Sequence, residues 1–219
     1  MTFPPRLILT LAGSSLLAVS FAKAQTTYTW ANSNVTNTPA TLDWFTGGPN
    51  TQGAWTGGTP VSSNLNTIRF FSAPPTAVPN TTTVTQGSNL NNGGTAFQLA
   101  TLTLSGQAPA TSNMDLAMSV TGDALNFSDA TGTINLDSVD VGANGRNIFW
   151  SVRNAIQLGT AGPSSQLTLT GNGSSAFNFS GSLSELQSGG GGKLIKSGSS
   201  TTTLSGAITV SGGIEVNGG

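Results

Sequence analysis

Carboxylates are the side chains of this sequence with the clearest chemical potential, and half of them lie close together in the chain. There are eight acidic residues among 219. One stretch contains four of them with two arginines nearby: Asp123, Asp129, Asp137, Asp140, Arg146 and Arg153. Carboxylates on neighbouring strands could bind Ca²⁺ through oxygen, and two facing carboxylates could cleave a glycosidic bond. Aspartate also commonly caps turns and ends strands, and we favour this structural interpretation.

Aromatic residues near the start of the chain form a second candidate site. Trp30, Trp44, Trp55, Tyr28 and Phe45 could stack against sugars, although packing in a core is the favoured role. Combining both groups, the candidates for a glycan or calcium site are Trp44, Trp55, Asp129, Asp137 and Asp140.

Several other chemistries lack the residues that they require. Histidine and cysteine are absent, which excludes a Ser-His-Asp triad, thiolate chemistry and a Cys/His zinc site. Four glycines precede Lys193, but the Ser or Thr and the helix that complete a phosphate-binding loop do not follow. We therefore expect neither a catalytic residue nor a cofactor, and we interpret 189–193 as a loop between strands.

The charge balance argues against nucleic acid as a partner. Only 7% of residues are charged, and the net charge is −1. Two of the seven basic residues, Arg6 and Lys23, lie in the apolar N-terminal segment described next, so the rest of the chain carries −3. Such a chain has no electrostatic attraction for phosphate backbones or anionic membranes.

The N-terminus has the pattern of a secretory signal peptide. Arg6 precedes a broken apolar run that is too short for a comfortable membrane span. The run ends in the small-x-small pattern of Ala22 and Ala24, which predicts cleavage before Gln25. We expect residues 1–24 to be removed, and no transmembrane helix in the mature chain.

A short motif of alternating apolar and polar residues that ends in glycine recurs after about residue 81. The clearest copies are at 102–106, 118–122, 167–171 and 177–181, and looser copies are at 125–127, 134–136, 156–159, 208–212 and 214–218. Alternation directs every second side chain to one face of a strand. Only 182–186 hints at a single helical turn.

Short strands of this kind leave two architectures, an antiparallel sandwich or barrel and a parallel β-solenoid. Hairpin dipeptides are scarce, the inward positions are uniformly Leu, Ile, Val or Phe, and the outward positions are Thr, Ser or Asn. These features favour a solenoid, in which like residues stack from coil to coil.

The chain divides into three parts on this basis. A signal peptide at 1–24 precedes a Trp/Pro-rich N-terminal cap region at 25–80 and a β-solenoid at 81–219. The C-terminal end carries no comparable cap in the sequence, so we expect it either to continue in a longer chain or to pair with something else.

The last part of the chain resembles a known repeat. The resemblance rests on Gly-Lys-Leu-Ile-Lys-Ser-Gly at 192–198, Thr-Thr-Leu-Ser-Gly-Ala at 202–207 and Val-Ser-Gly-Gly-Ile-Glu-Val-Asn-Gly-Gly at 210–219. Residues 190–219 are thus similar to an autotransporter-associated β-strand repeat, also called the passenger-associated transport repeat, of bacterial secreted proteins. The resemblance implies a right-handed parallel β-helix, a secreted or cell-surface location and a passenger role, and it implies no catalytic residue.

Taken together, these patterns predict a secreted or surface-exposed structural or adhesive module without catalytic activity. The expected partners are extracellular glycan, the cell envelope or other surface proteins. The alternative is a carbohydrate-active module, either polysaccharide lyase-like or carbohydrate-binding, on the same parallel β-helix.

Overall fold

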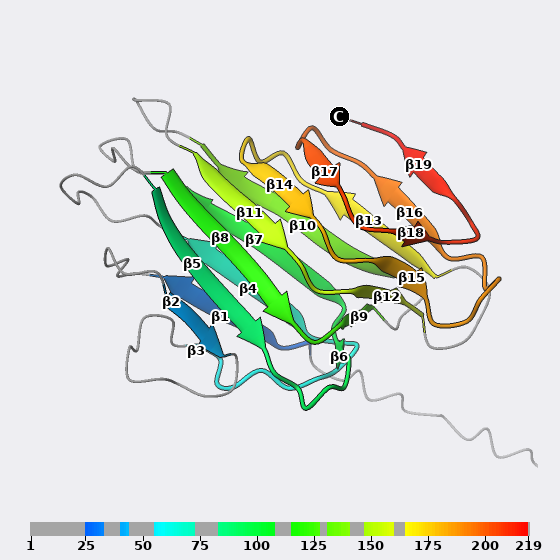
Figure 1. Cartoon of the computed structure of the whole chain (residues 1–219), viewed down its shortest axis with the longest axis horizontal. Coiled ribbons are helices and arrows are strands. Elements are labelled where there is room, and N and C mark those ends of the chain that lie inside the picture. Colours follow the sequence, from blue (N-terminus) through cyan, green and yellow to red (C-terminus); the bar gives the residue numbers. More distant parts are fainter. Residues whose placement is uncertain are drawn as a thin grey trace, which may run out of the picture.

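The computed structural model describes residues 25–32, 40–43, 55–72, 83–107, 115–127, 131–140, 147–159 and 165–218. Every regular element in these ranges is a β-strand (Figure 1). A search of the same ranges for a helix able to cross a membrane found none. Trp44, Asp129, Ala22 and Ala24 lie outside the described residues.

The strands form three sheets. The first contains, in spatial order, β19 (Ile214–Val216), β16 (Lys193–Lys196), β13 (Gln166–Thr170), β10 (Thr131–Val139), β7 (Thr101–Gln107), β4 (Thr67–Ser72), β1 (Thr27–Asn32) and β3 (Trp55–Thr56). The second contains β17 (Thr202–Leu204), β14 (Ala176–Phe179), β11 (Ile148–Val152), β8 (Asp115–Gly122), β5 (Thr83–Leu90) and β2 (Ala40–Asp43). The third contains β18 (Ile208–Thr209), β15 (Leu183–Glu185), β12 (Ile156–Leu158), β9 (Leu125–Phe127) and β6 (Phe97–Gln98).

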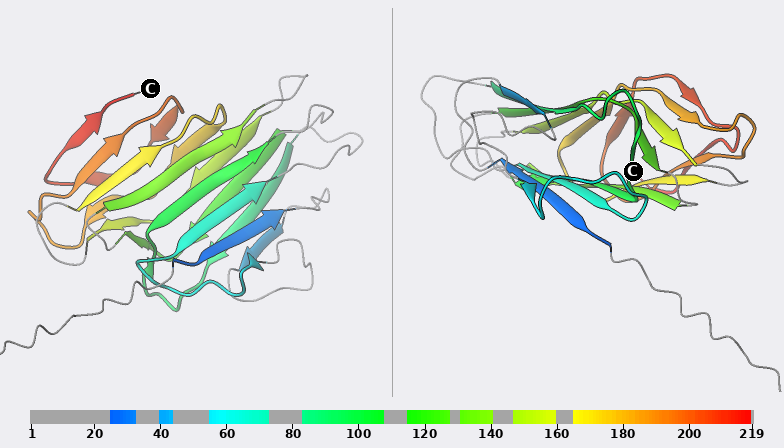
Figure 2. Two further views of the ribbon diagram at one scale, coloured as in Figure 1. Left: turned by 180° about the vertical axis from the view of Figure 1, so that it is seen from behind. Right: turned by 90° about the horizontal axis from the view of Figure 1, so that it is seen from below.

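The chain visits the three sheets in turn and repeats the circuit. From β4 onward, each coil has one strand in the first sheet, one in the second and one in the third, and the next coil lies beside it in parallel. We call this arrangement the coil stack. Figure 2 shows the first and second sheets as two facing layers. The exception is β3, which pairs antiparallel with β1 at the outer edge of the first sheet.

Like apolar residues stack on one another inside the coil stack. One inward row of the first sheet runs Trp30, Phe70, Leu104 and Leu136, all buried. A parallel row runs Tyr28, Ile68, Leu102, Ile134 and Leu169, also buried. Burial of a side chain of this size contributes about 1.5–3 kcal/mol to the free energy of unfolding. These rows therefore stabilise a fold whose described residues form few ion pairs.

The outward face of the first sheet is equally regular. Threonines occupy the same position in five successive strands: Thr27, Thr67, Thr101, Thr133 and Thr168. Side chains in such a row are about 4.8 Å apart, and Thr–Thr neighbours on one face favour pairing. The predicted division into apolar inward and small polar outward positions is therefore present in the fold.

The all-β, parallel arrangement is confirmed. Its parallel pairing begins with β1 and β4, within residues 25–80. The expected turn of helix at 182–186 is wrong, because Leu183–Glu185 forms β15. Leu183 pairs with Ile156 and Ile208 of the adjacent coils, and this tertiary pairing overrides a weak local preference.

Candidate functional site

The acidic residues that are close in sequence do not form a cluster in space. Within the described ranges, no group of three or more acidic side chains is placed to hold a metal ion. Asp129 and Arg146 lie outside these ranges, so the calcium prediction is assessed only for Asp123, Asp137 and Asp140. Asp123 and Asp140 have one role in common, and Asp137 has different surroundings.

Asp123 and Asp140 connect neighbouring segments of the coil stack. The Asp123 Oδ2 accepts hydrogen bonds from the backbone N–H of Asn92, at 2.6 Å, and of Gly94, at 3.0 Å. The Asp140 Oδ1 accepts from Ile148 N at 2.8 Å and from Ser175 Oγ at 2.7 Å. Both carboxylates satisfy backbone N–H groups in loops, which is the turn-capping role that we favoured from the sequence.

Trp55 belongs to the edge of the core. Its ring is half-buried and lies edge-on to Phe70, with ring centroids 5.6 Å apart. The ring of Trp30 packs against the same phenylalanine, with the two ring centroids 5.8 Å apart. The three rings form a packed aromatic cluster where β3 pairs with β1, so the geometry supports a packing role for Trp55 and not a sugar-stacking one.

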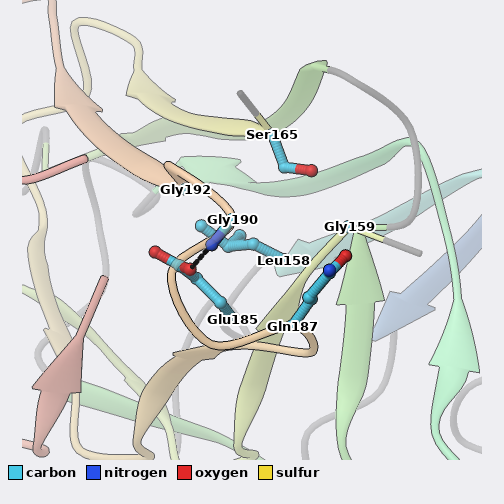
Figure 3. Close-up of a pocket in the computed structure, with 7 residues that line it drawn as sticks. All are labelled: Leu158, Gly159, Ser165, Glu185, Gln187, Gly190 and Gly192. Atoms are coloured by element: carbon cyan, nitrogen blue, oxygen red, sulfur yellow. Dashed lines mark hydrogen bonds between the residues drawn. The ribbon is translucent and has the colours of Figure 1, made fainter. Parts of the chain in front are cut away.

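Among the described carboxylates, Glu185 accepts the most hydrogen bonds, and the sequence did not single it out (Figure 3). In the third sheet it follows Phe127 and Leu158 in register, at a position where both preceding residues are buried and apolar. Its oxygens accept from the backbone N–H of Ser211, from Ser211 Oγ at 3.1 Å and from Gly190 N at 2.9 Å. One cavity beside it has a volume of about 10 Å³, which is room for about one water molecule. A second, open hollow, lined in part by Glu185, Gly189 and Ser211, has a volume of about 330 Å³.

These bonds keep Glu185 ionised and make it a structural group. The N–H of Ser211 has the largest effect and lowers the pKa of Glu185 below its usual 4.5. Burial has the next largest effect and opposes this shift, and the Ser211 hydroxyl and the N–H groups of Gly190 and Gly192 lower the pKa further. Its charge is used to hold the loop at 187–192 against the following coil.

This arrangement predicts a pH dependence that depends on Glu185. A lowered folded-state pKa means that the stabilisation is complete above pH 4.5 and is lost as the pH falls through the folded-state value. In Glu185→Gln, we expect lower protection factors for amide hydrogen exchange at 187–192 and 211 at neutral pH, and a smaller fall of these protection factors on acidification than in the wild type.

Glu215→Gln is the matched control. The pKa of Glu215 is also lowered, mainly by its hydrogen bond with Lys193, but Glu215 accepts no bond from the 187–192 loop. Hydrogen exchange of the loop in Glu215→Gln should therefore follow the wild type. Equal protection in Glu185→Gln and the wild type at pH 7 would contradict the assignment.

Asp137, the remaining sequence candidate, lines an open groove on the outward face of the first sheet. The groove has a volume of about 460 Å³ and is lined by Arg69, Phe71, Thr103, Ser105, Gly106, Asn135, Asp137 and Val139. Arg69 and Phe71 were not among the candidate residues identified from the sequence. One signal could have identified these two residues. Most outward residues of this sheet are small and polar, whereas Arg69 and Phe71, which also occupy outward positions, have large side chains.

The last coil of the stack carries exposed apolar residues. Leu204, Ile214 and Val216 are 37%, 52% and 71% exposed. The inward row of Leu169 continues through Lys196 to Val216. The Lys196 Nζ donates to the carbonyls of Ser197 and Gly198, and partial burial lowers the pKa of this amine below 10.5. Exposed sheet edges of this kind can pair with further strands.

Comparison of the chain with protein families, with curated proteins and with solved structures found no match.

Proposed function

We propose that this chain is a secreted or surface-exposed structural or adhesive module, a right-handed parallel β-solenoid of the passenger type without catalytic activity. The observation that carries the proposal is the continuous apolar spine beneath uniform rows of small polar residues, such as the five stacked threonines from Thr27 to Thr168. Such a stack is stable without metal or disulfide and presents a regular polar surface. The resemblance of residues 190–219 to autotransporter-associated repeats supports the same role.

The proposed export begins with removal of residues 1–24. Cleavage before Gln25 would preserve the first contacts of the coil stack. The Gln25 Nε2 donates to Thr67 Oγ1 at 2.9 Å, and Thr67 N donates to the Thr26 carbonyl at 2.9 Å.

A binding or structural role fits the polar groups better than catalysis. Hydrolysis of a glycosidic bond generally needs two carboxyl groups on opposite sides of the scissile bond. The described lining of the outward groove contains one carboxylate, Asp137, and the bonds of Asp123, Asp140 and Glu185 hold loops. The proposed partners are extracellular glycan, the cell envelope or other surface proteins, and do not include nucleic acid.

Expression of the chain with its own leader in a bacterial host tests the proposal. We expect the mature product to begin at Gln25, to occur outside the cytoplasm and to give a β-rich circular dichroism spectrum. Ala24→Pro, which disfavours processing at the predicted site, serves as the comparison and should retain the leader. An uncleaved cytoplasmic product, or release of new sugar ends from polysaccharides incubated with the pure wild type, would contradict the proposal.

A further inference from the structure

The outward groove of the first sheet has a simple physical origin. Its floor is β7, whose outward residues in this region are the small Thr103 and Ser105, and Gly106 follows them in the lining. The neighbouring strands carry larger side chains, Arg69 and Phe71 on β4 and Asp137 on β10. Because β4 and β10 are two strand spacings apart, the walls are separated by about 9.6 Å. The stacked strands thus form a trough one strand wide.

The β4 wall combines a cation with an aromatic ring. The Arg69 Nε donates to Ser105 Oγ at 3.0 Å, and the guanidinium carbon lies 5.5 Å from the centroid of the Phe71 ring. Ser105 is buried and its hydroxyl donates in turn to the carbonyl of Phe70, at 3.0 Å. These contacts hold the exposed guanidinium in place, and no described carboxylate lies within ion-pair distance of it. Its terminal N–H groups are left as donors.

The β10 wall supplies acceptors. The Asn135 Nδ2 donates to Asp137 Oδ2, which orients both side chains and leaves Oδ1 of each without a partner among the described residues. Asp137 is exposed, and Val139 adds a 36% exposed apolar surface at the end of the same strand. The groove therefore offers a fixed donor on one wall, fixed acceptors on the other and an apolar surface on each.

We propose that this groove binds a single chain of a neutral, hydroxyl-rich oligosaccharide. Sugar rings present hydroxyls that both donate and accept, and C–H faces that pack against aromatic and apolar side chains. Hydroxyls can satisfy the Arg69 donors and the Asp137 and Asn135 acceptors at once, whereas an anionic sugar attracted by Arg69 would be repelled by Asp137. The volume of about 460 Å³ is within the range of ligand sites.

The dimensions agree with an extended ligand that lies along β7. From the level of Asn135 to that of Val139 the chain advances four residues, or about 13 Å. This length accommodates roughly two or three linked sugar rings, and the trough is open at the surface. The site would make the module adhesive toward glycan, which extends the structural role proposed above and does not depend on the signal peptide or on the repeat resemblance.

Binding of defined oligosaccharides tests the inference. We would titrate the mature chain, residues 25–219, with neutral glucan, xylan and mannan hexasaccharides and, in parallel, with hexagalacturonate. We expect at least one neutral hexasaccharide to bind with a Kd of about 1 mM or lower, and hexagalacturonate to bind at least about tenfold more weakly. Asp137→Ala and Arg69→Ala should each weaken binding by about tenfold or more, and Thr103→Tyr, which fills the floor, should abolish it.

The chain offers matched controls on other surfaces. Arg153 is exposed on the second sheet side and its Nε donates to Ser151 Oγ at 3.4 Å, much as Arg69 does to Ser105. Thr168 is an outward threonine of the first sheet that does not line the groove. Arg153→Ala and Thr168→Tyr should change the affinity by less than about twofold. All variants should keep the wild-type circular dichroism spectrum. Asp137 and Thr103 are substituted in separate variants, so if one variant misfolds the other still tests the inference.

Three results would overturn the inference. They are no binding of any neutral hexasaccharide up to about 10 mM, tighter binding of hexagalacturonate than of the neutral sugars, and an affinity unchanged by Thr103→Tyr in the folded protein. A secreted, β-rich protein that gave any of these results would still satisfy the proposed structural role, so the two proposals fail separately.

Discussion

Gly171→Ala is expected to destabilise the coil stack by about 2–6 kcal/mol. Gly171 has a φ of +115°, a conformation that strains other residues by about 1–3 kcal/mol. A Cβ at this position would lie 2.4 Å from the carbonyl oxygen of Leu136, a backbone atom of the preceding coil. Since the backbone cannot turn aside as a flexible side chain can, overpacking adds about 1–3 kcal/mol. The free energy of unfolding in urea, followed by circular dichroism, measures the effect.

The control is Gly189→Ala, which separates the close approach from the backbone strain. Gly189 also has a positive φ, +77°, but no atom lies within 4 Å of the position that a Cβ would take. Both substitutions reduce the entropy of the unfolded chain equally. We expect Gly189→Ala to change the free energy of unfolding by about 1–2 kcal/mol at most. Equal destabilisation by both variants would show that the coils are not packed as closely at Gly171 as described.

Trp150→Ala is expected to lower the free energy of unfolding by about 3–5 kcal/mol, because it leaves a large cavity in the core. Trp150 is 1% exposed and stacks between Met118 and Phe177 of the adjacent coils. Its Nε1 has no acceptor in the described part of the chain, and an unsatisfied buried N–H costs about 1–3 kcal/mol. Trp150→Phe loses volume but removes this N–H, so we expect it to stay within about 1 kcal/mol of the wild type.

The adjacent residue provides the control for Trp150. Phe149 precedes it in β11, points outward and is 40% exposed. Phe149→Ala should change the free energy of unfolding by about 0.5 kcal/mol or less, as most surface substitutions do. A loss for Phe149→Ala as large as that for Trp150→Ala would contradict the inward and outward assignment of β11.

The inward and outward positions of single strands were readable from the sequence. The motif at 102–106 predicts that Leu102 and Leu104 face inward, and both are fully buried in the fold. The same holds for Leu167 and Leu169. The scarcity of hairpin dipeptides and the similarity of the inward residues also favoured parallel neighbours, which the pairing of β7 with β10 confirms.

The start of the stack and the residues of the groove were less accessible. The tryptophans and prolines of 25–80 predicted an N-terminal cap, but they did not show that Trp30 lies in register with Phe70 and Leu104. Glu185 was also missed, because alternation alone does not distinguish a buried apolar position from one where loop N–H groups surround a carboxylate. Of the three glycan or calcium candidates that the structure describes, Trp55, Asp137 and Asp140, it places Asp137 in an open groove.

Composition and alternation by themselves determined that this chain forms short strands with an apolar face and a small polar face, because the direction of a side chain in a strand depends only on its parity along the chain. Only the tertiary structure decided which strands are neighbours, because the coils differ in length. Ile68 pairs with Leu102, 34 residues later, whereas Leu194 pairs with Ile214, 20 residues later. Without a constant period, no local pattern could show that Phe71 and Asp137, 66 residues apart, occupy one row across β7 and face the same groove.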